Sequence, residues 1–232
     1  RKNAVRRPEM AERIKAGLYS DFRVVVVKGE AGIGKTQLVA EAAVDGLHAI
    51  GTFMSDEAFE RIIWIKASFD VAPIGHHLDG ILDFIASKVD TLLSSEGADN
   101  LTKLPSEDED DLKKRRLRKK QADINVLLQE RRLLVVIEDF EDPTVDRYGS
   151  KHKQSDKERE KRISQFNEVK EWLENTGPYA NPKSRIIVTS RSAIVAGFVV
   201  EITKLNNDEA KELLRDYERA IMLRRFCPRL SD

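Results

Sequence analysis

Five residues near the start of the chain have the types and spacing that bind a phosphate group. Gly29, Gly34, Lys35 and Thr36 fit the pattern G-x-x-x-x-G-K-[ST], and Gly32 adds a third glycine inside it. Glycines let backbone N–H groups close around phosphate oxygens. A lysine ammonium then reaches the β- and γ-phosphates, and a threonine hydroxyl binds Mg²⁺. The sequence therefore predicts a nucleotide-binding loop at this point.

The segments on both sides of this loop have the required character. Residues 22–28 (FRVVVVK) form a β-branched run, which is typical of a buried strand. Residues 36–43 (TQLVAEAA) are mostly good helix formers, and a helix N-terminus adds a partial positive charge to a phosphate site. Strand, loop and helix thus follow in the order that the chemistry needs.

Two later strands are also followed by residues that could act on a nucleotide. The apolar run 133–137 (LLVVI) predicts a strand that ends at Glu138 and Asp139. Residues 185–189 (RIIVT) predict another, followed by Ser190 and Arg191.

A triphosphate site needs a metal ligand and a group that positions water. We expect Glu138 to face Mg²⁺ and Asp139 to orient the attacking water, with Glu141 and Asp142 as weaker candidates. Arg191 would contact the γ-phosphate.

Strands and helices alternate along the rest of the chain, which predicts an α/β fold. We expect a three-layer αβα P-loop NTPase fold with a mostly parallel five-stranded sheet. Ligands bind at the carboxyl ends of such strands, so the loop, the acidic pair and Arg191 should meet at one edge. The further strands are expected at 61–67 and 198–202, and the further helices before residue 20 and at about 76–93, 121–132, 157–175 and 206–224.

Composition limits the classes of function. The 232 residues suit one large domain, and 40 basic against 40 acidic residues argue against a dedicated nucleic-acid binder. The one cysteine, Cys227, cannot form an internal disulfide and fits a reducing, cytoplasmic location. No apolar run approaches the roughly 20 residues that cross a bilayer, so no membrane span is expected.

Three features have a structural and a functional interpretation. The basic run 113–120 follows acidic residues, which suits the dipole of a solvated helix, but it also fits a nuclear-localisation or nucleic-acid patch. His76 and His77 are adjacent and cannot share one helix face as metal ligands, so we expect structural or surface roles. Trp64 is expected to belong to the core of its strand.

Several stretches together resemble the NB-ARC family of signal-transduction (STAND) ATPases, which includes apoptosis-activating scaffold proteins and plant intracellular disease-resistance receptors. Two departures from the family pattern are Glu138, where the family has aspartate, and Arg6, where it has glycine. The similar stretches are residues 5–9 (VRRPE), 28–36 (KGEAGIGKT), 59–68 (FERIIWIKAS), 131–142 (RRLLVVIEDFED), 183–191 (KSRIIVTSR) and 202–213 (ITKLNNDEAKEL).

The resemblance implies a nucleotide-binding domain at 1–205 and the start of a helical subdomain at 206–232. It implies an ADP-bound resting state and an ATP-bound state that forms homo-oligomers, in a signalling or innate-immune defence protein whose other domains contact this one. Hydrolysis of ATP would be slow. The implied nucleotide-binding residues are Val5, Arg6, Gly29, Gly32, Ile33, Gly34, Lys35, Thr36 and Gln37, the Mg²⁺ ligands Thr36 and Glu138, and the catalytic residues Lys35, Asp139 and Arg191.

Two other functions remain open on the sequence. The basic run 113–120 would suit an AAA+-like or nucleic-acid-linked ATPase, whose turnover DNA or RNA should stimulate. The glutamate at position 138 would suit a degenerate scaffold that keeps the fold and binds no nucleotide.

Overall fold

A computed structural model describes residues 7–48, 58–67, 77–89, 108–144, 156–175, 183–211 and 214–215. The predictions for Val5, Arg6, His76 and Cys227 lie outside the described residues. So do the expected ends of the helices at 76–93 and 206–224.

A five-stranded sheet forms the middle of the molecule, and all its pairings are parallel. This confirms the predicted parallel sheet. The strand order is β2-β3-β4-β1-β5, so the strand that precedes Arg191 lies between the strand of the glycine loop and the strand of the acidic pair. The strands are β1 (Val24–Lys28), β2 (Arg61–Lys66), β3 (Leu133–Glu138), β4 (Arg185–Ser190) and β5 (Phe198–Glu201).

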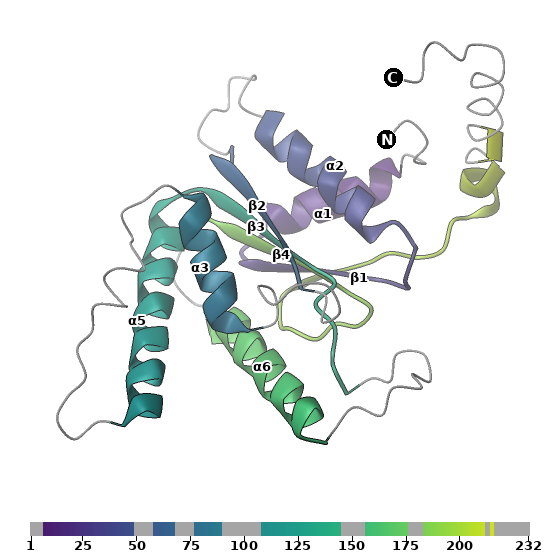
Figure 1. Ribbon diagram of the computed structural model, residues 1–232. Helices are drawn as coiled ribbons and strands as arrows, with labels where there is room; N and C mark the ends of the chain where they lie inside the picture. The colour runs from purple at the N-terminus through teal and green to yellow at the C-terminus, as the bar shows by residue number, and fades with distance from the viewer. Residues whose placement is uncertain are drawn as a thin grey trace, which may run out of the picture.

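Helices cover both faces of the sheet, which gives the expected three layers (Figure 1). One face carries α1 (Pro8–Leu18) and α2 (Lys35–His48). The other carries α3 (Leu78–Lys88), α5 (Glu109–Glu130) and α6 (Asp156–Asn175).

The start of α3 differs slightly from the prediction. The helix begins at Leu78 and not at 76, because His77 has extended backbone and caps it: the His77 Nδ1 accepts a hydrogen bond from the Gly80 N–H at 2.9 Å. His77 thus has the structural role that was expected.

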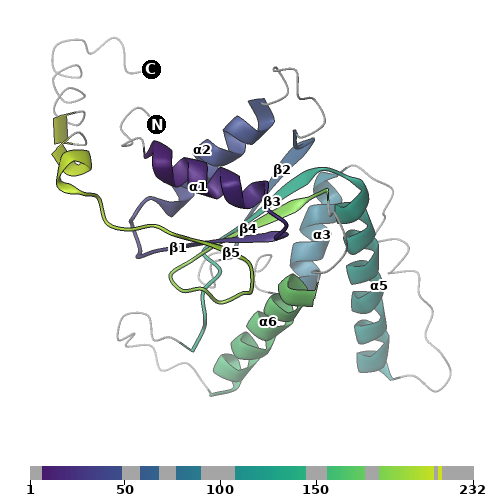
Figure 2. The same ribbon diagram turned by 180° about the vertical axis from the view of Figure 1, so that it is seen from behind.

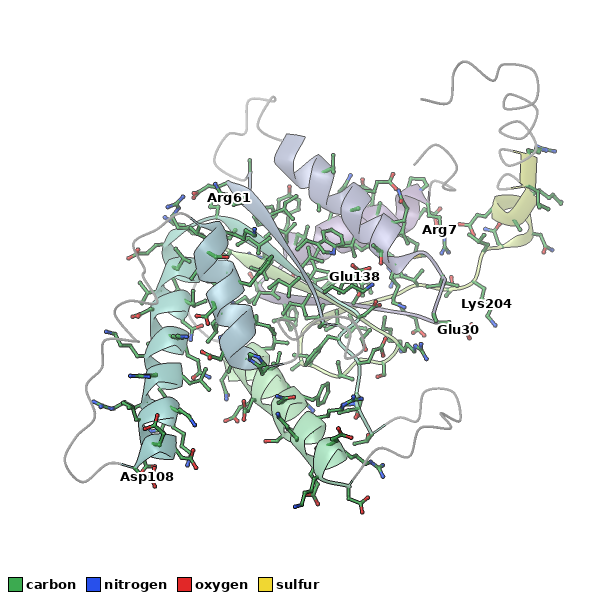
Figure 3. All side chains as sticks on the ribbon, in the orientation of Figure 1. Arg7, Glu30, Arg61, Asp108, Glu138 and Lys204 are labelled. Carbon is green, nitrogen blue, oxygen red and sulfur yellow. The ribbon has the colours of Figure 1, made fainter. Side chains whose placement is uncertain are left out.

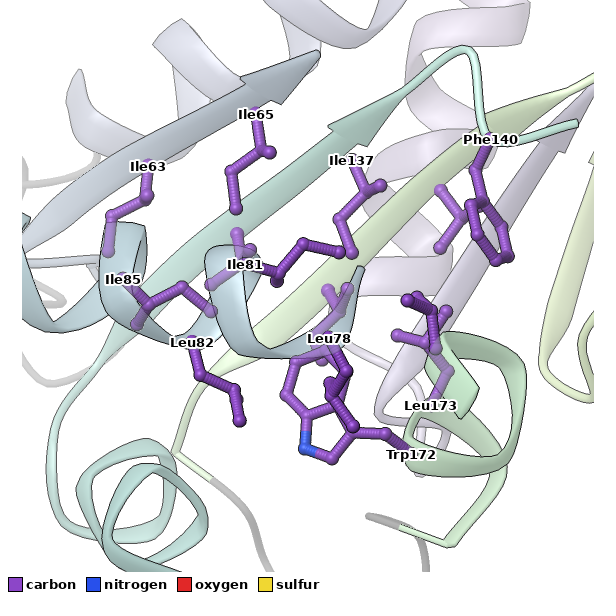
Figure 4. Packing of buried hydrophobic residues seen from close by; sticks show 14 of the residues in the cluster. Ile63, Ile65, Leu78, Ile81, Leu82, Ile85, Ile137, Phe140, Trp172 and Leu173 are labelled. Carbon is purple, nitrogen blue, oxygen red and sulfur yellow. The ribbon is translucent and has the colours of Figure 1, made fainter. Parts of the chain in front are cut away.

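Alternating side chains of the buried strands build two apolar cores. In β3, Leu133, Val135 and Ile137 face the α3–α5–α6 side, while Leu134 and Val136 face the α1–α2 side. Figure 4 shows the first core, in which α3 and Trp172 of α6 pack against β2 and β3. Because Glu138 follows Val136 by two residues, the same alternation directs its side chain to the α1–α2 side.

The chain returns to the glycine loop after β5, which is the edge strand beside β1 and lies against α1 (Figure 2). The Ile202 N–H donates to the Lys28 carbonyl at 2.7 Å. Beyond it, Asn206 and Glu209 form the predicted capping box: each accepts a hydrogen bond from the other's backbone N–H, at 2.9 and 2.8 Å.

The basic run lies on α5 as a helix, in agreement with the structural interpretation. Asp108 caps this helix by accepting a hydrogen bond from the Asp111 N–H at 2.7 Å. The Lys120 ammonium donates to Asp79 and Asp83 of α3, which ties the two helices together.

Candidate functional site

The carboxyl edge of the sheet carries the predicted site. The loop after β1 leads to α2 on one face, and the loop after β3 leads towards α6 on the opposite face. The two loops therefore separate over the end of β4. In open parallel sheets this is the kind of place at which ligands bind.

The glycines of residues 29–34, the glycine loop, are needed for two different reasons. Gly32 and Gly34 have φ angles of 75° and 97°, a left-handed region that side-chain-bearing residues rarely adopt. At Gly29 the limit is space, since a Cβ there would lie 2.9 Å from the Ile202 carbonyl oxygen. A loop with alternating backbone handedness turns successive N–H groups inward, which forms an anion-binding nest.

Lys35 is the first residue of α2 and is only 7% exposed. Its ammonium donates to the Gly29 and Glu30 carbonyls, at 2.7 and 3.0 Å, and so lies against the glycine loop. Burial lowers the pKa of Lys35, which the nearby Glu141 and Asp139 carboxylates partly offset. The fold thus keeps a cation beside the glycine loop although burial disfavours its charged form.

Thr36 and Glu138 are in direct contact although 102 residues separate them. The Thr36 hydroxyl donates to Glu138 Oε1, and the Trp64 indole N–H donates to Glu138 Oε2 at 2.9 Å. Figure 3 shows Glu138 at the sheet, near the end of α2 from which Thr36 comes. Both carboxylate oxygens are therefore oriented.

Asp139 occupies a turn with a φ of 58°, in the left-handed region. The Asp139 N–H donates to Thr189 Oγ1 and the Phe140 N–H to the Thr189 carbonyl, both at 3.0 Å. Phe140 then stacks on Phe166 of α6, with ring centroids 4.8 Å apart. These contacts leave the Asp139 side chain on the cleft.

Glu141 links the acidic turn to Arg191. Its carboxylate is almost fully buried and accepts hydrogen bonds from the Ser190 hydroxyl at 3.3 Å and the Arg191 N–H at 3.1 Å. The Arg191 Nε lies 3.8 Å from the other Glu141 oxygen. Asp142 instead accepts hydrogen bonds from the backbone N–H and the hydroxyl of Thr144.

These groups enclose a cleft of about 400 Å³, a size typical of small-molecule sites. Of the predicted residues, Gly29 and Ile33 do not line it: Gly29 packs on Ile202, and Ile33 packs on the α1–α2 core. Glu138 lies behind Thr36. The lining residues are Ala31, Gly32, Gly34, Lys35, Thr36, Gln37, Asp139, Glu141 and Arg191.

The donor set suits a phosphate with Mg²⁺. Backbone N–H groups, an ammonium and a guanidinium suit phosphate oxygens, and the touching Thr36 hydroxyl and Glu138 carboxylate are hard oxygen ligands. No group of three or more His, Cys, Asp or Glu side chains among the described residues could hold a metal alone. Mg²⁺ in nucleotide sites typically takes one or two protein ligands together with phosphates and water.

Sequence reasoning underestimated two contacts. The Trp64 indole reaches Glu138 because β2 and β3 pair in parallel with Trp64 opposite Val136, a register that the sequence does not reveal. Glu141 was only a weaker candidate. The signal for it was Ser190 at the end of β4, because a buried hydroxyl there needs a hydrogen-bond acceptor.

Among the described residues, no helix combines the length and apolar character that a membrane crossing requires. No protein-family model matches this chain, and no curated protein matches it either. Function is therefore inferred from the residues of the cleft.

Proposed function

We propose that the chain is a nucleotide-binding switch module that holds ADP or ATP with Mg²⁺ in this cleft. The observation that supports it best is the contact of Thr36 with Glu138 beside the glycine loop. A G-x-x-x-x-G-K-T loop alone is a sequence pattern. Joined to a carboxylate from a distant strand, it has the parts of a metal–phosphate site.

Each side chain has one role in this proposal. Lys35 and the N–H groups of the glycine loop bind the phosphates, and Thr36 and Glu138 hold Mg²⁺. Bound Mg²⁺ neutralises charge on the β- and γ-phosphates. Asp139 orients the attacking water, and Arg191 contacts the γ-phosphate, with Glu141 fixing its backbone.

The slow hydrolysis, the preference for adenine and the link between ATP and homo-oligomers rest on the resemblance to NB-ARC proteins. One close approach supports a switch: the segment after β5 packs against the glycine loop, where a Cβ at Gly29 would lie 2.9 Å from the Ile202 carbonyl oxygen. Lys204 lies 3.4 Å from Glu30, and the two side chains are neighbours in Figure 3. A change at the loop would thus reach residues that lead towards a further subdomain.

The test compares Lys35→Ala with Lys28→Ala. Lys28 precedes the loop, pairs with Glu201 at 3.2 Å and does not line the cleft, so it is a matched control. Millimolar ATP with Mg²⁺ should raise the unfolding midpoint of the wild type and of Lys28→Ala. A ligand at 100 times its Kd adds about 2.7 kcal/mol to the unfolding free energy. Lys35→Ala should show no rise.

Heat release of bound nucleotide and its chromatography provide the second readout. Stoichiometric ADP from the purified protein supports the proposal. A wild type that releases no nucleotide and gains no stability from ATP would count decisively against it and favour the scaffold alternative.

A further inference from the structure

The two carboxylate oxygens of Glu138 accept hydrogen bonds from two different residues. Oε1 accepts the Thr36 hydroxyl, and Oε2 accepts the Trp64 indole N–H at 2.9 Å. The hydroxyl belongs to the proposed Mg²⁺ site, whereas the indole lies outside the cleft.

The sheet register brings Trp64 to this position. Trp64 pairs with Val136, and Lys66 pairs with Glu138. The Trp64 and Glu138 side chains therefore lie on the same face of the sheet, two register positions apart on adjacent strands. The Trp64 ring is half-buried and packs against the α1–α2 core. The apolar body of the ring is thereby fixed, and its single N–H points along the sheet to Glu138.

The chemistry of the indole makes this contact one-sided. An indole N–H can only donate a hydrogen bond, and it has no lone pair with which to bind a metal itself. Bonded to Oε2, it leaves Oε1 directed towards the Thr36 hydroxyl, at the proposed metal site. Outer contacts of this kind orient a ligand, and their loss typically lowers metal affinity by about 10–100-fold.

We propose that Trp64 is a positioning residue that presents Glu138 Oε1 to Mg²⁺. This inference rests on the proposed function, because it assigns a role at the same metal site. Through its two contacts, the Glu138 side chain links the edge strand β2 to the start of α2.

The second tryptophan of the chain supplies a matched control. Trp172 lies on α6 in the opposite core, and its indole N–H donates to Asn125 at 3.3 Å. Changing either tryptophan to phenylalanine keeps an aromatic ring and removes one bonded N–H. Only the N–H of Trp64 meets the proposed site.

The experiment measures the affinity for the non-hydrolysable analogue adenylyl imidodiphosphate at a series of free Mg²⁺ concentrations and in EDTA. Trp64→Phe should need at least about 10-fold more Mg²⁺ for half of the gain in affinity, with an unchanged affinity in EDTA. Trp172→Phe should follow the wild type. A merely structural role of Trp64 would lower the unfolding midpoint without moving the Mg²⁺ dependence.

Equal Mg²⁺ dependence of Trp64→Phe and the wild type would overturn the inference, as would equal shifts in both tryptophan variants. A wild type that binds no analogue with or without Mg²⁺ refutes the proposed function itself, and the inference with it. The two failures are distinguishable, because the second is seen in the unaltered protein.

A fluorescence measurement keeps the test valid if Trp64→Phe does not fold. Trp172→Phe leaves Trp64 as the one tryptophan, since the chain has two. Its emission should change when Mg²⁺ is added to the analogue-loaded protein, because the acceptor of the indole N–H becomes a metal ligand. An unchanged emission would also overturn the inference.

Discussion

The two ends of the same parallel sheet use charged and polar groups in opposite ways. At the amino end, Ser184 and Glu60 bond to the chain itself. Ser184, which is fully buried, donates to the Arg131 carbonyl at 2.6 Å and accepts from the Leu133 N–H at 3.0 Å. Glu60 accepts from the Arg132 N–H at 3.0 Å and from Arg131 Nε at 2.6 Å.

At the carboxyl end, the charged groups converge on a cleft. Lys35, Asp139, Glu141 and Arg191 line one cavity.

The two pKa shifts express this difference. The hydrogen bond from the Arg132 N–H lowers the pKa of Glu60, which favours its charged form. Burial lowers the pKa of Lys35, which disfavours its charged form. The fold thus stabilises the charge of Glu60 and tolerates that of Lys35. A buried charge whose pKa is shifted by its surroundings is common at functional sites.

Removing the Ser184 hydroxyl should give the largest effect at the amino end. Ser184→Ala leaves the buried Leu133 N–H without its acceptor, which costs about 1–3 kcal/mol of unfolding free energy. Urea denaturation measures the change, and the stabilisation by ATP with Mg²⁺ should persist. Ser87→Ala, at an exposed helical serine, is the control and should change stability by less than about 0.5 kcal/mol. An equally small change in Ser184→Ala would contradict the comparison.

Removing a side chain at the carboxyl end should have the opposite sign. Asp139→Gly relieves the left-handed backbone at φ 58° and should add up to about 1 kcal/mol of stability. It should also abolish ATP hydrolysis, which a phosphate-release assay measures.

Asp139→Ala is the control for this prediction, because it removes the same carboxylate and keeps a Cβ in the strained turn. It should lose hydrolysis without the gain in stability. If both variants were equally stable, the backbone at 139 would not be strained. The turn would then differ from the amino end in no respect that affects stability.

Much of this arrangement was predictable from the sequence. The β-branched run 22–28 and the apolar run 133–137 identified two strands. Each chemical group was placed at a strand end, so a parallel sheet brought the groups together. The capping box at Asn206 was predictable because both partners lie within one turn. Local patterns of this kind need no knowledge of distant contacts.

The remaining features depend on how distant strands align. The Trp64 contact needs the β2–β3 register, and the burial of Glu141 needs the end of β4 beside the acidic turn. The positive φ of Asp139 follows from Thr189, which accepts the two N–H groups of that turn. These are long-range constraints, and the residue types alone do not encode them.

The charge of Glu60 predicts a modest pH dependence of stability. Its folded pKa is lowered, so its contribution is present above the ordinary glutamate value of about 4.3 and is lost as the pH falls through the folded pKa. Glu60→Gln should lower stability by no more than about 1 kcal/mol at pH 7, because the carboxylate is 40% exposed. The gap between wild type and variant should narrow as the pH falls below the ordinary glutamate value. Urea denaturation at neutral pH and at acid pH checks it, and a constant gap would contradict the assigned cause.

The smallest effect is expected for the exposed ion pair between Lys204 and Glu30, at the carboxyl end but outside the cleft. Both side chains are at least 70% exposed, and such pairs contribute little and are screened by salt. Lys204→Ala should therefore change the unfolding free energy by less than about 0.5 kcal/mol, and that change should disappear in about 0.5 M salt. A larger, salt-independent loss would mean that this pair holds the segment after β5 to the glycine loop. The carboxyl end would then carry structural charge as the amino end does, and the coupling proposed for the switch would pass through Lys204.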